Sequence, residues 1–431
     1  MQSREIRAAG ELLAAALGGA STFVGEIHGA ISSRPFAGVG IAGAPVRAIH
    51  DRVAATAYRT VATGLGAIPK AGAALMARTL PADGPSVSHS LPGSIALGAL
   101  NGAIGDALAR EHEELALPMT LRLHGQEVTR DRGGLAGAYA DATPKLAVFV
   151  HGLCETDEAW LLAAPHPDGR PRRSYGSRLQ QDLGYTPLYV RYNTGLRISD
   201  NGRRLSEILE EAVEAWPTPV EEIVLVGHSM GGLVARSACH YGCEDGAAWP
   251  GSVRHVFCLG SPHLGAPLEK AANLAGYALA RLPETRPLAE VVNGRSAGIK
   301  DLRFGSCVEE DWCDGDPDEF LKDRCREVPF LEGATYYFIA ATLSTEADGL
   351  LGSLVGDLLV RFPSASGNGR RRRIPFEVGH GRHFGRITHF HLLNHPAVYE
   401  QIRAWLAGTA AIESPPDAPV TGAGAQTPPS A

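Results

Sequence analysis

The chain has 431 residues, and its 40 Lys and Arg against 47 Asp and Glu give a formal net charge of −7. This balance argues against a general nucleic-acid binder, which needs a basic surface, and the 44% hydrophobic content excludes a chain that is disordered throughout. The length suggests two or three domains. The 51 Gly and 29 Pro beside only 6% aromatic residues predict a part of the chain that has little to pack with.

The first 115 residues are rich in Ala and Gly. Arg4 and Arg7 precede a short apolar run, Leu12 to Ala20, in the manner of a secretory leader, but Glu5 and Glu11 flank that run. The sequence therefore favours an amphipathic helix of a cytoplasmic protein over export. No run of 18 uninterrupted apolar residues is present, so a membrane-spanning helix is not expected.

Further along this zone, apolar residues recur at helical spacing. They are Val46, Ile49, Val53, Ala57 and Val61. Glycines between residues 38 and 66 interrupt the pattern, which predicts several short, loosely packed helices. Two roles are open for residues 1–115: an accessory helical layer on the main domain, which is favoured, or peripheral contact with a membrane or lipid surface through the apolar face.

Residues 116–408 alternate short apolar runs with helical patterns. The runs are Met119–Leu123, Lys145–Val150, Pro187–Tyr192, Ile223–Val226, Val253–Leu259 and Thr335–Ala340. Strands that are apolar throughout and separated by helices, such as the helix expected at Arg203 to Trp216, imply a mostly parallel sheet covered on both faces. We predict a doubly wound α/β domain here and, from residue 409 to 431, a disordered tail rich in Pro and Ala.

A long insertion, residues 263–333, separates the last two of these strands. Between Asp301 and Glu327 it carries ten acidic and four basic residues, and it is expected to form a cap or lid over the substrate pocket. A basic run, Arg370 to Arg373, follows later and is either a solvated loop or a site for anionic headgroups. We expect the acidic stretch and the basic run to border the same pocket.

Cysteine usage and the known ligand motifs add little. The seven cysteines stand at irregular spacings, which suits a reducing compartment, and only Cys307, Cys313 and Cys325 are close enough in sequence to suggest a disulfide. No phosphate-binding loop, dinucleotide motif or paired metal ligands stand in a suitable context, so we expect no cofactor, no metal and no nucleic-acid partner.

Two segments match the G-x-S-x-G pattern of a nucleophile elbow, one centred on Ser229 and one on Ser296. Ser229 follows the strand-like run Ile223–Val226 and precedes a helical pattern. That arrangement places a serine hydroxyl above the edge of the sheet. Ser296 follows no strand of useful length. We therefore expect Ser229 to be the nucleophile and reject Ser296.

A serine nucleophile also needs N–H donors for the oxyanion that develops on its substrate. The expected strand Lys145–Val150 ends at His151-Gly152, where a turn can present a backbone amide to the elbow. The expected donors are the amides of Met230 and of either Leu153 or Cys154. Substrate contacts are expected from the same loops, at His151, Gly152, His228, His263 and Leu264.

In this architecture an acid and then a histidine follow the serine along the chain. The late histidines are His380, His383, His389, His391 and His395, of which His389 is favoured because a helical pattern anchors the segment after it. Asp348 and Asp357 both follow the run Thr335–Ala340, and spacing alone does not choose between them.

Three motifs together carry a family resemblance: His151-Gly152-Leu153, Gly227–Gly232 and Gly260–Pro267. They resemble α/β-hydrolases of the bacterial esterase/lipase type, related to the PGAP1-like group, over about residues 145 to 408. The family acid lies in Gly-Asp-x-Leu-Val followed by Ser-Ala, which Gly356–Val360 and Ser364-Ala365 match, so the resemblance selects Asp357.

The family histidine lies in Asn-His-x-x-Leu-Leu, which Thr388–Leu393 matches with Thr in place of Asn. The resemblance thus implies a Ser229, His389 and Asp357 triad that hydrolyses hydrophobic or lipid-like esters through an acyl-enzyme. A thioesterase or an acyltransferase would use the same triad. A lipid-surface or scaffold protein with an inactive hydrolase domain is the alternative of a different class.

Overall fold

The computed structural model describes residues 2–39, 44–79, 84–162, 164, 173–316, 318–342, 360–369, 372–377 and 379–408. Some predictions concern residues outside these ranges: those for Asp348, Asp357, Arg370 and the tail from residue 409.

The described strands are short and the helices vary widely in length. The strands are β1 (Thr120–Leu123), β2 (Gln126–Val128), β3 (Lys145–Val150), β4 (Thr186–Arg191), β5 (Glu222–His228), β6 (Val253–Leu259), β7 (Thr335–Thr342) and β8 (Gly381–Gly385). The α-helices are α1 (Ser3–Val39), α2 (Ala44–Ala77), α3 (Leu91–Glu111), α4 (Arg132–Ala138), α5 (Tyr175–Leu183), α6 (Ile198–Ala215), α7 (Met230–Glu244), α8 (Pro267–Leu279), α9 (Arg286–Asn293), α10 (Ala297–Asp301), α12 (Phe362–Ala365) and α13 (Pro396–Leu406). Short 3₁₀ turns are η2 (Val87–His89), η3 (Glu113–Leu115), η4 (Asp157–Leu161), η5 (Trp249–Ser252), η6 (Glu309–Asp311) and η7 (His389–Leu393).

The strands form one sheet in the order β2-β1-β4-β3-β5-β6-β7-β8. From β4 to β8 each neighbouring pair is parallel, whereas β1 is antiparallel to both β2 and β4. The predicted doubly wound α/β class is therefore confirmed. The six predicted strands agree with β1 and β3 to β7 to within about two residues, whereas β2 and β8, the two edge strands, were not predicted.

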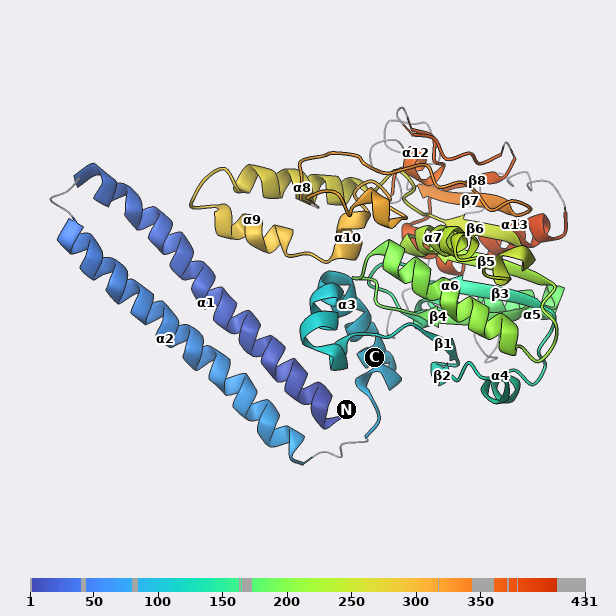
Figure 1. Ribbon diagram of the computed structural model, residues 1–431, viewed down its shortest axis with the longest axis horizontal. Helices are drawn as coiled ribbons and strands as arrows, with labels where there is room; N and C mark the ends of the chain where they lie inside the picture. Colours follow the sequence, from blue (N-terminus) through green and yellow to red (C-terminus); the bar gives the residue numbers. More distant parts are fainter. Residues whose placement is uncertain are drawn as a thin grey trace, which may run out of the picture.

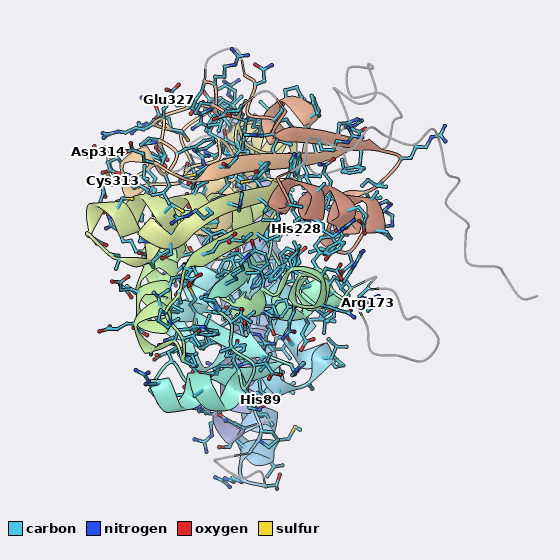
Figure 2. All side chains as sticks on the ribbon, turned by 90° about the vertical axis from the view of Figure 1, so that its right-hand side faces the viewer. His89, Arg173, His228, Cys313, Asp314 and Glu327 are labelled. Carbon is cyan, nitrogen blue, oxygen red and sulfur yellow. The ribbon has the colours of Figure 1, made fainter. Side chains whose placement is uncertain are left out.

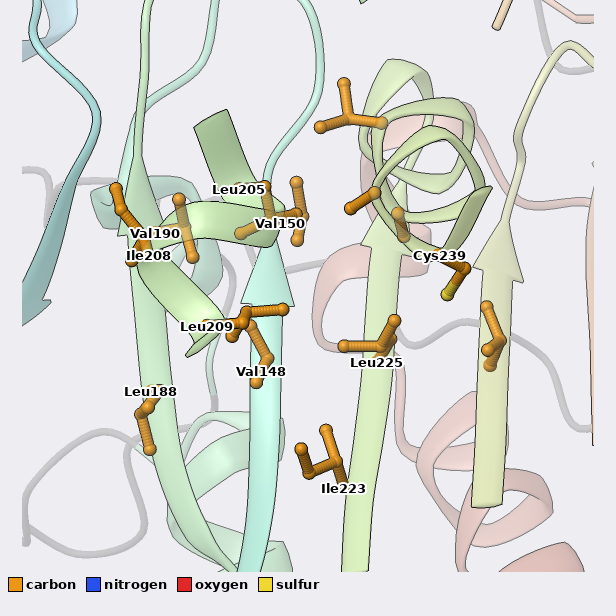
Figure 3. Packing of buried hydrophobic residues seen from close by; sticks show 14 of the residues in the cluster. Val148, Val150, Leu188, Val190, Leu205, Ile208, Leu209, Ile223, Leu225 and Cys239 are labelled. Carbon is orange, nitrogen blue, oxygen red and sulfur yellow. The ribbon is translucent and has the colours of Figure 1, made fainter. Parts of the chain in front are cut away.

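Alternate residues of the central strands point to opposite faces of the sheet. On one face Val148, Val150 and Leu225 pack against Leu205 and other side chains of α6 and α7 (Figure 3). On the other face Phe149, Val224 and Val226 pack with residues of α5 and α13. Burial of both faces explains why these strands lack the polar alternation of a half-exposed sheet.

The N-terminal part differs from the prediction of several short helices. The two helices α1 and α2 contain 37 and 34 residues, and they form an antiparallel hairpin that projects away from the sheet (Figure 1). Glycines inside the helices do not break them, because several lie where the two helices meet. A Cβ at Gly10 would lie 2.2 Å from the Ala73 Cβ, and one at Gly25 would lie 3.0 Å from the Tyr58 ring.

Helix α3, although it belongs to the glycine-rich zone, packs directly on the sheet domain. A Cβ at Gly102 would lie 2.3 Å from Cys154 Sγ, and one at Gly105 would lie 1.9 Å from Asn193 Oδ1. The hydroxyls of Ser94 and Thr156 lie 3.0 Å apart. The predicted domain boundary between residues 115 and 116 would therefore separate α3 from the loop after β3, which α3 supports.

The insertion of residues 263–333 contains α8, α9 and α10. Much of its acidic character is neutralised by ion pairs: Asp301 with Arg197, and Asp318 with Lys300. Cys313, Asp314 and Glu327 lie at the periphery and are well separated from His228 in Figure 2. Asp314 and Glu327 therefore do not border the site described below. All seven cysteines are free thiols.

Candidate active site

Ser229 stands in a sharp turn between β5 and α7, with φ 53° and ψ −121°. Few residues other than Gly adopt positive φ, and such a conformation costs on the order of 1–3 kcal/mol. The flanking glycines make the turn possible, since a Cβ at Gly227 would lie 2.4 Å from the Gly232 amide nitrogen and one at Gly231 would lie 2.1 Å from the Val150 carbonyl oxygen. The chain thus uses a strained elbow to hold one serine.

The loop after β3 passes against this elbow. A Cβ at Gly152 would lie 3.0 Å from the Ser229 Cβ, so a larger residue there would have to displace the elbow or the loop. The Cys154 amide donates to Thr194 Oγ1 at 3.2 Å, and the Gly152 amide donates to the Glu155 carboxylate at 2.6 Å. Both amides are therefore engaged. Within the described chain, the Leu153 amide has no acceptor, which favours it over Cys154 as an oxyanion donor.

The second expected donor, the Met230 amide, is the first of helix α7. Amides of the first helical turn have no acceptor within their helix, and the helix dipole makes this end attractive to negative charge. Met230 and Leu153 thus belong to two elements that meet beside Ser229, and their role as oxyanion donors stays a prediction.

His389 is 2% exposed and lies beside the elbow. Its ring centroid is 4.7 Å from that of His228, and a Cβ at Gly260 would lie 3.0 Å from its Cε1. The Ser229 amide donates to the Leu259 carbonyl at 2.8 Å, so the end of β6 contacts both the serine and the histidine segments.

Thr388, which replaces the family asparagine, takes the capping position of η7. Its amide donates to His391 Nδ1 at 3.1 Å. The other late histidines are held elsewhere: His383 bonds Thr342 at 2.8 Å, and the His395 carbonyl accepts from Tyr175. The structure does not place the acid, because both candidates fall outside the described residues.

Three of the side chains expected to contact substrate are fully buried: those of His151, His228 and His263. His151 donates from Nδ1 to the Gly152 carbonyl at 3.0 Å and accepts the Tyr192 amide at Nε2, and burial lowers its pKa to about 4. His263 lies 3.2 Å from Arg236, and burial together with Arg236 and Arg372 lowers its pKa well below the usual value. None of these three side chains has exposed surface in this structure, and their contact with substrate stays a prediction.

Leu264 is partly exposed, and its amide donates to Ser364 Oγ at 3.1 Å. Ser364 also donates to the Gly265 carbonyl. Arg372, from the basic run, donates to the carbonyls of His263 and Phe304, so it holds backbone rather than facing a headgroup. Ser296 is fully buried, caps α10 and donates to the Gly102 carbonyl, which agrees with its rejection as nucleophile.

One residue of the site, Glu155, was not predicted from the sequence. Its carboxylate lies 3.1 Å from His228 Nδ1 and accepts the Gly152 amide, while His228 Nε2 lies 3.2 Å from the His389 carbonyl. Burial alone would raise the pKa of Glu155, but His228 and the Gly152 amide hold it below its usual value. The only signal in the sequence was a carboxylate three residues after the glycine of the loop.

The mostly parallel sheet with a serine elbow after β5 is an α/β-hydrolase fold, as the motifs imply. The later histidine, His389, follows the elbow in the chain order of this fold. Residues 147–281 match the family model of the PGAP1-like alpha/beta domain. The matched segment runs from β3 through α8 and contains the His151-Gly152 loop and Ser229 but not His389. No match was found among curated proteins.

Several solved structures share the fold at low identity. They include mature Bacillus licheniformis lipase BlEst2 (18% identical; 61% of this chain and 91% of that chain covered; TM-score 0.39). A lipase-esterase related protein from Clostridium acetobutylicum is 16% identical, with 61% and 94% covered and a TM-score of 0.31. A thermophilic esterase from Thermogutta terrifontis is 11% identical, with 68% and 93% covered and a TM-score of 0.35. At these values the likeness carries no activity over to this chain.

Proposed function

We propose that this chain is a serine carboxylic-ester hydrolase acting on hydrophobic or lipid-like esters. Ser229 Oγ attacks the ester carbonyl while His389 accepts its proton, and the oxyanion is held by the Met230 and Leu153 amides. His389 then protonates the leaving alcohol, which leaves an acyl-enzyme. Water, activated by His389, releases the acid. Asp357 would orient the imidazole and stabilise its cation.

The observation that carries this proposal is the backbone of Ser229. A non-glycine residue at φ 53° and ψ −121° is costly to hold, and three glycine positions around it are shaped to allow it. A structural serine needs no such geometry. The adjacent Gly152 loop and buried His389 give this strained serine an oxyanion site and a base.

Support for apolar substrates comes from the surroundings of the base. Phe390 follows His389 directly and is 54% exposed, with the two ring centroids 5.9 Å apart. An exposed aromatic side chain next to the base offers an apolar surface to an acyl chain.

The test is hydrolysis of p-nitrophenyl esters of graded acyl length by the wild type, Ser229→Ala and Ser296→Ala. We expect the wild type and Ser296→Ala to turn over and Ser229→Ala to lose activity by at least about a thousandfold. Phe390→Ser should weaken the preference for longer acyl chains. Absence of turnover by the folded wild type would favour the inactive scaffold alternative.

Two further measurements on the wild type separate ester hydrolysis from the alternatives that share the triad. An acyl thioester turned over faster than the oxygen ester of equal chain length would favour a thioesterase. Transfer of the acyl group to an added alcohol in preference to water would favour an acyltransferase. Ester hydrolysis predicts neither result.

A further inference from the structure

The hairpin of α1 and α2 has its large apolar side chains on the outside. We define the outer stripe as Val46, Ile49, Val53, Val61, Ile68 and Leu75 of α2, each between 51% and 73% exposed. With the small residues Ala57, Gly64 and Ala71 it repeats in steps of three and four residues, the period of a straight α-helix. The stripe is therefore a straight line about 44 Å long on one face of the helix.

The residues of α2 that face α1 are mostly small. They are Ala54, Tyr58, Ala62, Gly66, Pro69, Ala73 and Ala77, all of them less exposed than the stripe. Ser21 of α1 donates to the Tyr58 carbonyl at 3.1 Å, which shows how closely the two backbones approach. Helices that contact lipid commonly have small residues where they meet one another and large apolar residues on the outside. A helix that packs on a soluble core shows the reverse, with its large apolar residues facing inward.

Cations accompany the outer stripe. Arg52, Arg59 and Lys70 are exposed and lie 7 and 11 residues apart, which places them along one edge of α2. With Arg47 and Asp51 the helix carries a net charge of +3, within a chain whose net charge is −7. A basic row beside an apolar stripe is complementary to the anionic headgroups and acyl chains of a bilayer surface.

The positions of these charges along α2 indicate whether the hairpin spans the membrane or lies on its surface. A spanning helix needs about 20 predominantly apolar residues, but charged residues divide α2 so that its longest uncharged run is residues 60–69. In α1, the segment Ser3–Ser33 is long and apolar enough to span a membrane, a test that signal sequences and core helices of soluble proteins also pass. We propose that the hairpin lies flat on an anionic lipid surface, with the outer stripe in the bilayer and the cations at the headgroups.

This inference deepens the proposed function by naming the surface at which an ester hydrolase would meet its substrate. The test uses the full chain in co-sedimentation with vesicles of phosphatidylcholine, alone or mixed with phosphatidylglycerol. We expect binding to the mixed vesicles, weakened by added salt because the headgroup attraction is screened. Equal binding to both vesicle types, or none to either, would contradict the proposal.

Variants locate the contact. Ile49→Ser with Ile68→Ser should lower vesicle affinity by at least about tenfold, because two exposed apolar side chains leave the bilayer. Ile95→Ser in α3 is the matched control, since Ile95 is 51% exposed but lies outside the hairpin, and it should bind as the wild type does. Unchanged binding by the double variant would overturn the assignment of the outer stripe.

The charge row is tested separately by Arg52→Gln, Arg59→Gln and Lys70→Gln together. This variant should lose the preference for phosphatidylglycerol and the salt dependence, and retained preference would contradict the role of the row. A concentration-dependent dimer that the Ile49→Ser and Ile68→Ser variant abolishes, without vesicle binding by the wild type, would instead identify a second copy as the occupant.

Turnover of a soluble short-chain p-nitrophenyl ester, measured without vesicles, separates this inference from the proposed function. Hydrolysis without vesicle binding would contradict only the lipid-surface proposal. Vesicle binding by a protein that neither hydrolyses the ester nor reacts with a fluorophosphonate would contradict only the enzyme proposal.

Discussion

Glu155 lies 3.1 Å from Nδ1 of His228, and the same carboxylate oxygen accepts the Gly152 amide. His228 Nε2 faces the His389 carbonyl at 3.2 Å. A carboxylate and a carbonyl are both acceptors, so His228 satisfies them together only when each ring nitrogen carries a proton. The buried pair thus joins the oxyanion loop, the elbow and the segment of the base.

Glu155→Gln is expected to lower kcat by about tenfold to a hundredfold with little change in KM. The neutral amide weakens the hydrogen bonds that the carboxylate makes with His228 and the Gly152 amide, and a hydrogen bond to a charged group contributes about 1.5–3 kcal/mol of unfolding free energy. Steady-state kinetics well below the melting temperature would measure the first effect and denaturant unfolding the second.

Glu158→Gln is the matched control, since Glu158 lies three residues further on and contacts neither His228 nor Gly152 in the described hydrogen bonds. It should keep wild-type kcat. Loss of stability in Glu155→Gln with an unchanged kcat would reduce Glu155 to a structural residue and contradict the positioning role.

Gly102→Ala should lower kcat/KM by at least about tenfold, because the new Cβ would lie 2.3 Å from Cys154 Sγ and push the loop that bears the Leu153 amide. Gly72→Ala is the control, since nothing lies within 4 Å of its Cβ position. It should leave activity unchanged and stabilise its helix by up to about 1 kcal/mol. Equal activity of the two variants would show that α3 does not position the oxyanion loop.

The buried, neutral His151 predicts sensitivity to acid. Its folded pKa of about 4 is below the usual 6.5, so between these values the unfolded chain binds the proton more readily. The stability that it contributes is present above pH 6.5 and is lost as the pH falls towards 4. Between pH 7 and pH 5 the wild type should lose about 2 kcal/mol more unfolding free energy than His151→Gln. Parallel pH profiles in urea unfolding would refute this.

The acid is tested by two matched variants. Asp357→Asn should lose most activity, because the His389 imidazole would lose the partner that sets its tautomer, by about 10⁴-fold in the comparable triad of the serine proteases. Asp348→Asn should retain activity. The reverse outcome would assign the acid to Asp348.

The elbow could be predicted from sequence because its chemistry is local. A tight turn around Ser229 needs glycines at fixed offsets, and the apolar strand before it is visible as a run of residues. The base could be predicted in part, since chain order and the anchored segment after His389 restrict the choice. These features depend on neighbours in sequence.

Other features depend on contacts between distant segments. The abundance of Gly in the first 115 residues predicts loose packing, whereas in α3 Gly102 and Gly105 are required by close approach to Cys154 and Asn193. The pairing of Glu155 with His228 joins residues 73 positions apart, and no local sequence pattern predicts it. The stripe on α2 was visible in the sequence, but only the fold shows that it faces outward.

The central claim is that Ser229 is the nucleophile. The most direct measurement is peptide mass spectrometry of the wild type, Ser229→Ala and Ser296→Ala after treatment with a fluorophosphonate. The account predicts one adduct per chain, on the peptide that contains Ser229, in the wild type and in Ser296→Ala, and none in Ser229→Ala. An adduct that persists at another serine in Ser229→Ala, or no adduct on the folded wild type, would contradict it.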